Sequence, residues 1–501
     1  MTPYRPTVLR FRPSGLPRAS GATPAAAAVL SLVLVAAACS TNPATGQRQL
    51  SLISEQQEIQ MGRQADQQIV QQLGLYPDDE LQRYVQSVGM KLARESERPE
   101  LPWTFRVVDD PTVNAFALPG GYIYLTRGIL THLDNEAEMA SVLGHEIGHV
   151  TARHSVERLS KAQLAQIGLG IGMILSPEFR NYGDLAQTGL SLLFLKYGRD
   201  DERQADDLGV RYLASEGYDP RQMPRVFETL ERVSQAEGAG RVPSWLSTHP
   251  DPGSRAERIS RAVAEANLDL SGAEVARQAY LRRIDDVVYG PDPREGYFRG
   301  STFYHPELAF QIDFPSGWKT SNQKQAVGAI SPNQDAVVVL TLSGRDDPTS
   351  AAREFFSQQG IQQGQARRGE INGMRAVASQ FGVDRQQGAD IVGVAAFVEH
   401  QSRVYQLLGY STAQRWRAYD SAAEQAIDSF RRVTDRRILN VQPKRIDIVS
   451  IPSAMTLDEF SRRYPSTVDL QTLALINQAQ PGTRFDRGTE LKRVVGGELP
   501  G

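Results

Sequence analysis

His145, Glu146 and His149 form the pattern His-Glu-x-x-His within an apolar part of the sequence. On a helix, side chains four positions apart lie on one face about one turn apart, so the two imidazoles can bind one metal ion together. Glu146 then stands where it can take a proton from zinc-bound water, which is hydrolytic chemistry. Apolar flanking residues predict a buried helix, where imidazoles without a ligand would be unfavourable. The motif therefore predicts a site for one Zn²⁺ per chain.

A catalytic zinc needs a third protein ligand if one position is to stay open for water. His154 follows His149 by only five residues, and we predict a solvated or helix-capping role for it. Glu202 and Asp206 stand one helical turn apart in an acid-rich segment. They form either a charged, solvated helix face or a functional pair, in which Glu202 binds the metal and Asp206 orients a ligand histidine.

The elements that position these residues are visible in the local pattern. Residues 135–155 predict a helix with Asn135 as its N-cap and Glu138 three residues later. The turn at Pro119-Gly120-Gly121 leads into a strand at Tyr122–Leu125. This strand is either an edge that pairs with an extended substrate or a plain core strand.

Two apolar, glycine-containing stretches follow at 164–175 and 189–195. They form either a lid or membrane-facing cover over the cleft, or ordinary buried helices.

Composition excludes several classes of protein. The length of 501 residues allows about three domains. Lys and Arg number 55 against 58 Asp and Glu, which argues against a protein that binds nucleic-acid phosphates. The single cysteine excludes an intramolecular disulfide and a cysteine-based zinc cluster.

The N-terminal sequence accounts for that cysteine. Residues 1–24 carry arginines and no acidic residue, and an apolar run from Ala25 to Ala38 ends at Cys39. This is the pattern of a secretory signal peptide at 1–38. The run resembles a bacterial lipobox, in which Cys39 is lipidated and becomes the mature N-terminus, although Ala36 stands where leucine is usual. The alternative is an ordinary secreted protein with an incidental cysteine.

Four segments in order resemble the HExxH metallopeptidase family of CAAX-prenyl endopeptidases and OMA-type proteases. They read NAFALPGGYIYLTRGIL, NEAEMASVLGHEIGHVTARH, YGRDDERQADDLGVRYL and LSTHPDPGSRAERI. The sequence looks closest to the periplasmic lipoprotein branch related to the β-barrel assembly-enhancing protease.

The resemblance assigns a role to each candidate residue. It implies that His145, His149 and Glu202 bind zinc, that Glu146 is the general base, and that Asp206 matches the family's supporting aspartate. His249 matches a histidine near the metal, which acts as an oxyanion stabiliser or as an extra ligand in a closed state.

We expect an α+β multidomain fold. A mainly helical, zincin-type metallopeptidase domain with a small sheet is predicted at 39–285. An antiparallel α+β domain with weak similarity to the PsbP-like fold is predicted at 300–434. Residues 444–496 look like a divergent LysM module, from a family that binds N-acetylglucosamine-containing glycans.

The resemblance implies a zinc endopeptidase of the bacterial cell envelope that hydrolyses extended or misfolded envelope proteins in quality control. The alternative is a cell-wall-tethered binding or chaperone-like lipoprotein with a largely latent peptidase domain. The expected partners are unfolded or misassembled envelope proteins, peptidoglycan or the outer-membrane assembly machinery, and the membrane through a lipid anchor, but no nucleic acid. The expected location is the outer membrane, facing the periplasm, because Ser40 follows Cys39 in place of the aspartate that retains lipoproteins in the inner membrane.

Overall fold

The computed structural model describes residues 39–168, 196–237, 245, 248–250, 252–384 and 390–500. The predicted signal peptide at 1–38, the apolar stretch at 189–195 and residues 169–175 of the other apolar stretch lie outside the described residues. Among the described helices, none has both the length and the apolar character needed to cross a membrane.

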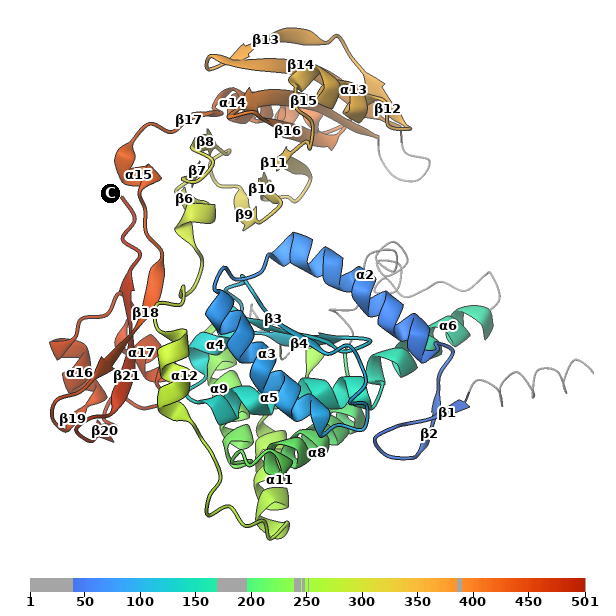
Figure 1. The fold of residues 1–501 in the computed structure, drawn as a ribbon. Coiled ribbons are helices and arrows are strands. Elements are labelled where there is room, and N and C mark those ends of the chain that lie inside the picture. The colour runs from blue at the N-terminus through green and yellow to red at the C-terminus, as the bar shows by residue number, and fades with distance from the viewer. Residues whose placement is uncertain are drawn as a thin grey trace, which may run out of the picture.

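The N-terminal part of the chain is mainly helical, with a small sheet (Figure 1). It begins with a hairpin of β1 (Cys39–Thr41) and β2 (Arg48–Leu50). Its helices are α2 (Glu55–Leu73), α3 (Asp79–Arg94), α4 (Arg127–His132), α5 (Glu136–Thr151), α6 (His154–Gly168), α8 (Arg199–Ser215), α9 (Gln222–Glu237), α11 (Pro252–Glu265) and α12 (Arg277–Ile284).

The small sheet consists of β3 (Thr104–Val108), β4 (Ala115–Leu118) and β5 (Tyr122–Thr126) in the order β3-β5-β4. β5 pairs in parallel with β3 and antiparallel with β4. The prediction of a substrate-pairing edge at Tyr122–Leu125 is therefore wrong, because both edges of this strand are already hydrogen-bonded. The core-strand alternative holds, and every residue of β5 is buried.

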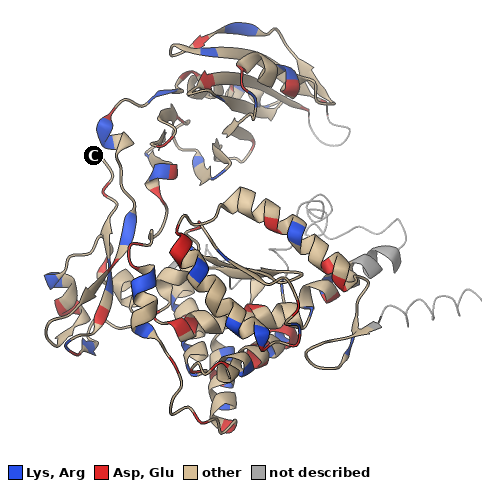
Figure 2. Cartoon of the chain, in the orientation of Figure 1, with Lys and Arg blue, Asp and Glu red and all other residues tan. Residues whose placement is uncertain are grey.

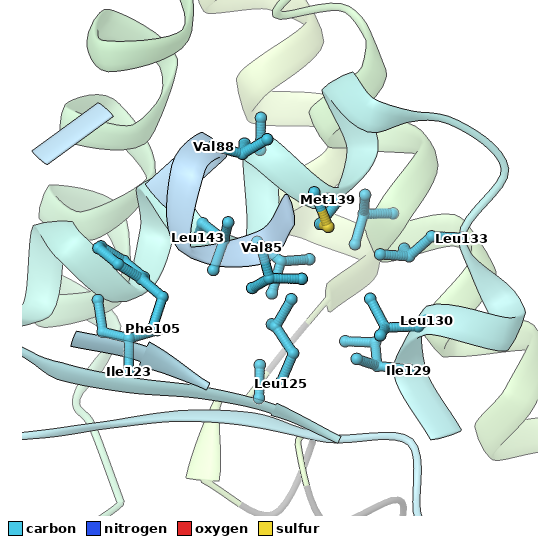
Figure 3. Close-up of a cluster of buried hydrophobic side chains, with 14 of the residues drawn as sticks. Val85, Val88, Phe105, Ile123, Leu125, Ile129, Leu130, Leu133, Met139 and Leu143 are labelled. Atoms are coloured by element: carbon cyan, nitrogen blue, oxygen red, sulfur yellow. The ribbon is translucent and has the colours of Figure 1, made fainter. Parts of the chain in front are cut away.

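Helix α5 carries the His-Glu-x-x-His motif and lies in the middle of this part. It begins where the sequence predicts, since the Asn135 side chain accepts a hydrogen bond from the backbone N–H of Glu138. All residues of α5 are buried, which its apolar composition explains. Its Met139 and Leu143 pack with Val85 of α3 and Leu125 of β5 (Figure 3).

The middle of the chain folds into antiparallel sheets with two longer helices. One sheet has the order β12-β14-β15-β16-β11-β10-β9, with β13 paired to β14, and another has the order β17-β8-β7-β6. The elements are η3 (Pro293–Glu295), β6 (Tyr297–Arg299), β7 (Thr302–His305), β8 (Phe310–Asp313), β9 (Lys319–Gln323), β10 (Ala326–Ile330), β11 (Ala336–Leu342), α13 (Pro348–Phe356), β12 (Ile361–Gln363), β13 (Arg367–Ile371), β14 (Met374–Val383), β15 (Ile391–His400), β16 (Arg403–Thr412), η4 (Trp416–Ala418), α14 (Asp420–Asp428), β17 (Arg431–Arg432) and α15 (Arg436–Leu439).

The C-terminal part is a small β-α-α-β unit with its own apolar core. Its elements are β18 (Lys444–Ser450), β19 (Met455–Thr456), α16 (Leu457–Arg463), α17 (Leu470–Ile476), β20 (Arg484–Phe485) and β21 (Glu490–Gly496). β18 pairs antiparallel with β21. The predicted α+β, multidomain organisation is confirmed in this general form, while the domain boundaries and the LysM assignment stay predictions.

This C-terminal unit contacts the start of the motif helix. Lys492 is fully buried, and its ammonium group donates to the carbonyl oxygen of Leu133 at 2.7 Å. Gln478 donates to the Glu138 carboxylate at 2.7 Å. The two contacts attach the unit to the residues at which α5 begins.

Candidate metal centre

The metal centre lies where α5 packs against α8. His145 and His149 come from α5, Glu202 comes from the first turns of α8, and His249 precedes α11. One ligand atom from each of these four side chains lies within 4.8 Å of those of the other three, and all four residues are buried. Glu202 and His249, about 50 residues apart in the sequence, thus complete the group of ligands that begins with His145 and His149.

The donor atoms point toward one another. The Nε2 atoms of His145 and His149 are 3.0 Å apart. The carboxylate of Glu202 lies 3.6 Å from Nε2 of His145 and 3.5 Å from Nε2 of His149. Nδ1 of His249 lies 3.2 Å from Nε2 of His145 and 3.0 Å from the Glu202 carboxylate.

The donor set fits a zinc ion. Imidazole nitrogens and a carboxylate oxygen are ordinary zinc ligands, and two histidines with one glutamate form a familiar catalytic set. Glu146 gives an independent indication, because both of its carboxylate oxygens are buried and make no hydrogen bond to any described residue. A buried carboxylate without hydrogen bonds is costly, so this position suits a cation and a polar molecule beside it.

The ionisable groups of the centre shift one another's pKa values. Burial and the neighbouring histidines hold the pKa of His149 well below its usual value, so this imidazole is neutral and can donate its lone pair. Burial raises the pKa of Glu202, but His249 and Arg255 outweigh it and hold that pKa below the usual value. Burial lowers the pKa of His249, yet the carboxylates of Glu202 and Glu146 outweigh it and raise that pKa.

Asp206 supports His145 from the side away from the other ligands. Its carboxylate lies 3.1 Å from Nδ1 of His145. A carboxylate only accepts, so the proton of the neutral ring stands on Nδ1 and leaves Nε2 free for a metal. Burial opposes ionisation of Asp206, but Arg255 and His145 outweigh it and hold the pKa of Asp206 below its usual value.

The predicted solvated or capping role of His154 is wrong. His154 is 3% exposed, and its Nδ1 lies 2.8 Å from Nδ1 of His149. Its Nε2 lies 2.8 Å from the side-chain oxygen of Gln204 on α8. His154 therefore supports the second ligand histidine, as Asp206 supports the first.

Aromatic rings hold the histidines in place. Tyr197 stacks on His149 with ring centroids 3.7 Å apart, and Trp245 stacks on His249 at 4.6 Å. His249 is only 1% exposed, so it is not a loop residue with surface contacts alone. The structure brings His249 into the group of ligand atoms, and Nε2 of His249 lies 3.5 Å from the Glu146 carboxylate.

Sequence reasoning missed Arg255. Its guanidinium makes two contacts with Asp206, at 3.0 and 2.6 Å, and its Nη1 lies 2.5 Å from Glu202. The arginine is 5% exposed. One signal was available: on α11 the buried positions include Arg255, Ile259 and Val263, so this arginine occupies the apolar face of an amphipathic helix. Figure 2 shows that α8 and α11, the helices of these paired charges, carry both acidic and basic residues.

Comparison with known proteins agrees with this arrangement. Residues 79–263 match peptidase family M48. The β-barrel assembly-enhancing protease of Escherichia coli (strain K12) is 33% identical over 223 residues, which are 43% of this chain and 45% of that protein. The mitochondrial metalloendopeptidase OMA1 of Arabidopsis thaliana is 38% identical over 194 residues, or 38% of this chain and 37% of that protein. The chain thus spans less than half the length of these curated relatives.

The solution structure of cyanobacterial PsbP from Synechocystis sp. PCC 6803 aligns with 27% of this chain and 95% of its own, at 15% identity and a TM-score of 0.23. The PsbP-like assignment of residues 300–434 stays a prediction.

Zinc content tests the ligand set. Glu202→Ala and His149→Ala each remove a donor atom, so zinc affinity should fall by more than the roughly 10–100-fold that an outer hydrogen-bond partner contributes. Glu146→Gln is the matched control, because it changes a buried side chain beside the ligands without removing one, and it should retain zinc. Metal analysis after dialysis against a chelator measures all three. Full zinc retention in both Glu202→Ala and His149→Ala would contradict the assignment.

Proposed function

We propose that residues 79–263, which match peptidase family M48, form a zinc metallopeptidase domain through which this chain hydrolyses peptide bonds within extended or misfolded proteins of the bacterial cell envelope. The observation that carries the proposal is Glu146. It is a fully buried carboxylate that no described residue pairs by a hydrogen bond, and it stands beside the ligand group formed by His145, His149, Glu202 and His249.

Each residue of the centre has its own role in the proposed reaction. His145, His149 and Glu202 would hold a zinc ion, and the ion would supply Lewis acidity to a water molecule and to the scissile carbonyl. Glu146 takes the proton of the attacking water and hands it to the leaving amine. Asp206 and His154 keep the two ligand rings in the orientation that binds the metal.

His249 can act at this centre as an extra metal ligand or as an oxyanion donor, and the distances favour the extra-ligand role. Its Nδ1 lies within 3.2 Å of His145 Nε2 and 3.0 Å of the Glu202 carboxylate, among the ligand atoms. An imidazole there can act as an extra ligand that excludes the attacking water, and the enzyme is then latent. If the ring moves away from the ligands, it can donate a hydrogen bond to the oxyanion instead.

The envelope setting rests on the relatives and on the N-terminal sequence. One relative is named a β-barrel assembly-enhancing protease, and it shares 33% identity with this chain. Cys39 follows a signal-like run and carries the proposed lipid anchor, and Ser40 after it supports a proposed location at the outer membrane, facing the periplasm. Misassembled envelope proteins are the proposed substrates, and the β-α-α-β unit is a candidate for contact with peptidoglycan.

A second function stays open because His249 lies among the ligands. A chain held in this arrangement would act as a binding or chaperone-like lipoprotein with a latent peptidase domain. Hydrolysis by the purified protein separates the two functions.

Casein hydrolysis by the zinc-loaded protein tests the proposed activity. Glu146→Gln should lower the rate by about 10²–10⁴, because it removes the general base. Its zinc content should equal that of the wild type, which separates a lost base from a lost metal. Equal hydrolysis by Glu146→Gln and wild type would contradict the mechanism, and a zinc-loaded wild type without hydrolysis would favour the binding function.

His249→Ala tests the latent state. Because the ring lies among the ligand atoms, we expect its removal to raise basal casein hydrolysis or to cause self-cleavage. If the ring acts only as an oxyanion donor, the rate falls instead, by about 10²–10³. Wild-type rates with unchanged zinc content and stability would exclude both roles.

Cys39→Ser tests the lipid anchor. The substitution removes the acylated thiol, so the protein should move from the membrane fraction to the soluble periplasmic fraction, since stable anchoring depends on the acyl chains. Fractionation and palmitate labelling measure the change. An unlabelled wild type, with unchanged fractionation of the variant, would overturn the anchor.

A further inference from the structure

A chain of hydrogen bonds runs from the N-terminal hairpin to the metal centre. It passes from Asn42 to Gln204, then to His154, and reaches His149. We propose that Asn42, Gln204 and His154 are positioning residues that together set which nitrogen of His149 carries the proton, and so leave Nε2 free to bind the metal. The inference rests on the zinc site of the proposed function.

Asn42 sets which group donates and which accepts in this series of hydrogen bonds. Its side-chain oxygen accepts from the backbone N–H groups of Ala44 and Thr45, at 2.9 and 3.3 Å. Its amide nitrogen therefore faces the opposite way, and it donates to the carbonyl oxygen of Ala152 at 3.1 Å, just beyond the end of α5. Asn42 is 6% exposed. Three backbone partners thus hold its amide in one orientation.

This orientation fixes the amide of Gln204. The nitrogen of Asn42 lies 3.2 Å from the side-chain oxygen of Gln204 and can only donate to it. The same oxygen lies 2.8 Å from Nε2 of His154. Because a carbonyl oxygen only accepts, Nε2 of His154 must carry a proton.

The ring protons of His154 and His149 then have only one arrangement in which His149 can bind a metal. With its proton on Nε2, a neutral His154 presents an unprotonated Nδ1 that accepts a hydrogen bond. The partner atom is Nδ1 of His149, at 2.8 Å, which must therefore donate. A neutral imidazole holds one proton, so Nε2 of His149 keeps its lone pair and faces the centre.

The two ligand histidines are thus oriented by different means. His145 is oriented by the charged carboxylate of Asp206, on the facing helix. His149 is oriented by a series of neutral groups that ends at the backbone of the N-terminal hairpin. The hairpin that begins at Cys39, the predicted lipid-anchor residue, therefore supports the metal site, although it supplies no ligand.

Two nearly isosteric substitutions test the proposal. Gln204→Met removes the acceptor that holds the proton on His154, and Asn42→Asp removes the donor that holds Gln204. Each should lower zinc affinity, by about 10–100-fold for Gln204→Met, as expected for the loss of an outer partner of a metal ligand. Competition with a chromogenic chelator on the full-length protein measures the affinity.

A spectroscopic measurement separates positioning from a general structural effect. The sequence has only 7 histidines, so ¹⁵N-histidine labelling can resolve the ring of His149. The metal-free wild type should show the proton of this ring on Nδ1, and both variants should shift it toward Nε2. Both substitutions act through the same series of hydrogen bonds. The double variant should therefore bind zinc no more weakly than Gln204→Met alone, which is a non-additive result.

Gln222→Met is the matched control. Gln222 is a buried glutamine whose side-chain oxygen accepts from Asn135, away from the metal ligands. Its substitution should leave zinc affinity and the His149 ring unchanged. The proposal is overturned if either folded test variant keeps wild-type zinc affinity and ring protonation, or if the two losses simply add. A wild type that binds no zinc overturns the proposed function and this inference together.

Discussion

Helices α5 and α8 pack so closely that only very small residues fit between their backbones. A Cβ atom at Gly148 would lie 3.0 Å from the Cα atom of Ala205, and a Cβ at Gly209 would lie 3.2 Å from the backbone nitrogen of His145. The distance between packed helices depends on the side chains at the contact. A larger residue at Gly148 would push α8 outward, and Glu202 would then lie farther from both ligand histidines. The spacing of the metal site is therefore set by positions that carry no chemistry.

The close packing also buries two like charges of α8, and arginines compensate for them. Glu202 and Asp206 are both buried on α8, one turn apart. Arg255 contacts both carboxylates, and Arg258 adds a contact to Asp206 at 2.9 Å. Buried ions are stable only when they are paired and hydrogen-bonded. Glu146 has no hydrogen bond to the described residues and lies 3.5 Å from one imidazole, that of His249, and it is also the residue to which the proposed chemistry assigns a proton.

The sequence was sufficient to predict the features that depend only on the spacing of neighbouring residues. His145 and His149 share a face because they are four positions apart on a helix, and the N-cap at Asn135 is equally local. The place of β5 inside its sheet was not predictable from alternation, because it depends on parallel pairing with β3. His154 was assigned wrongly for a related reason. The backbone at Arg153 has a φ of 58°, in the left-handed region, and this turn between α5 and α6 points His154 back toward His149.

Both ends of the motif helix are held by parts of the chain that lie far away in sequence. At its C-terminal end, Asn42 donates to the carbonyl oxygen of Ala152. At its N-terminal end, Gln478 donates to Glu138, and Lys492 donates to the carbonyl oxygen of Leu133. None of these three donors lies within residues 79–263, the part that matches the peptidase family. The family match thus contains the ligand group together with His154 and Gln204, whereas Asn42, Gln478 and Lys492, which hold the ends of α5, come from outside it. Because a metal site tolerates little displacement of its ligands, a change in the hairpin or in the C-terminal unit that broke these contacts would loosen α5 and the two ligands it carries.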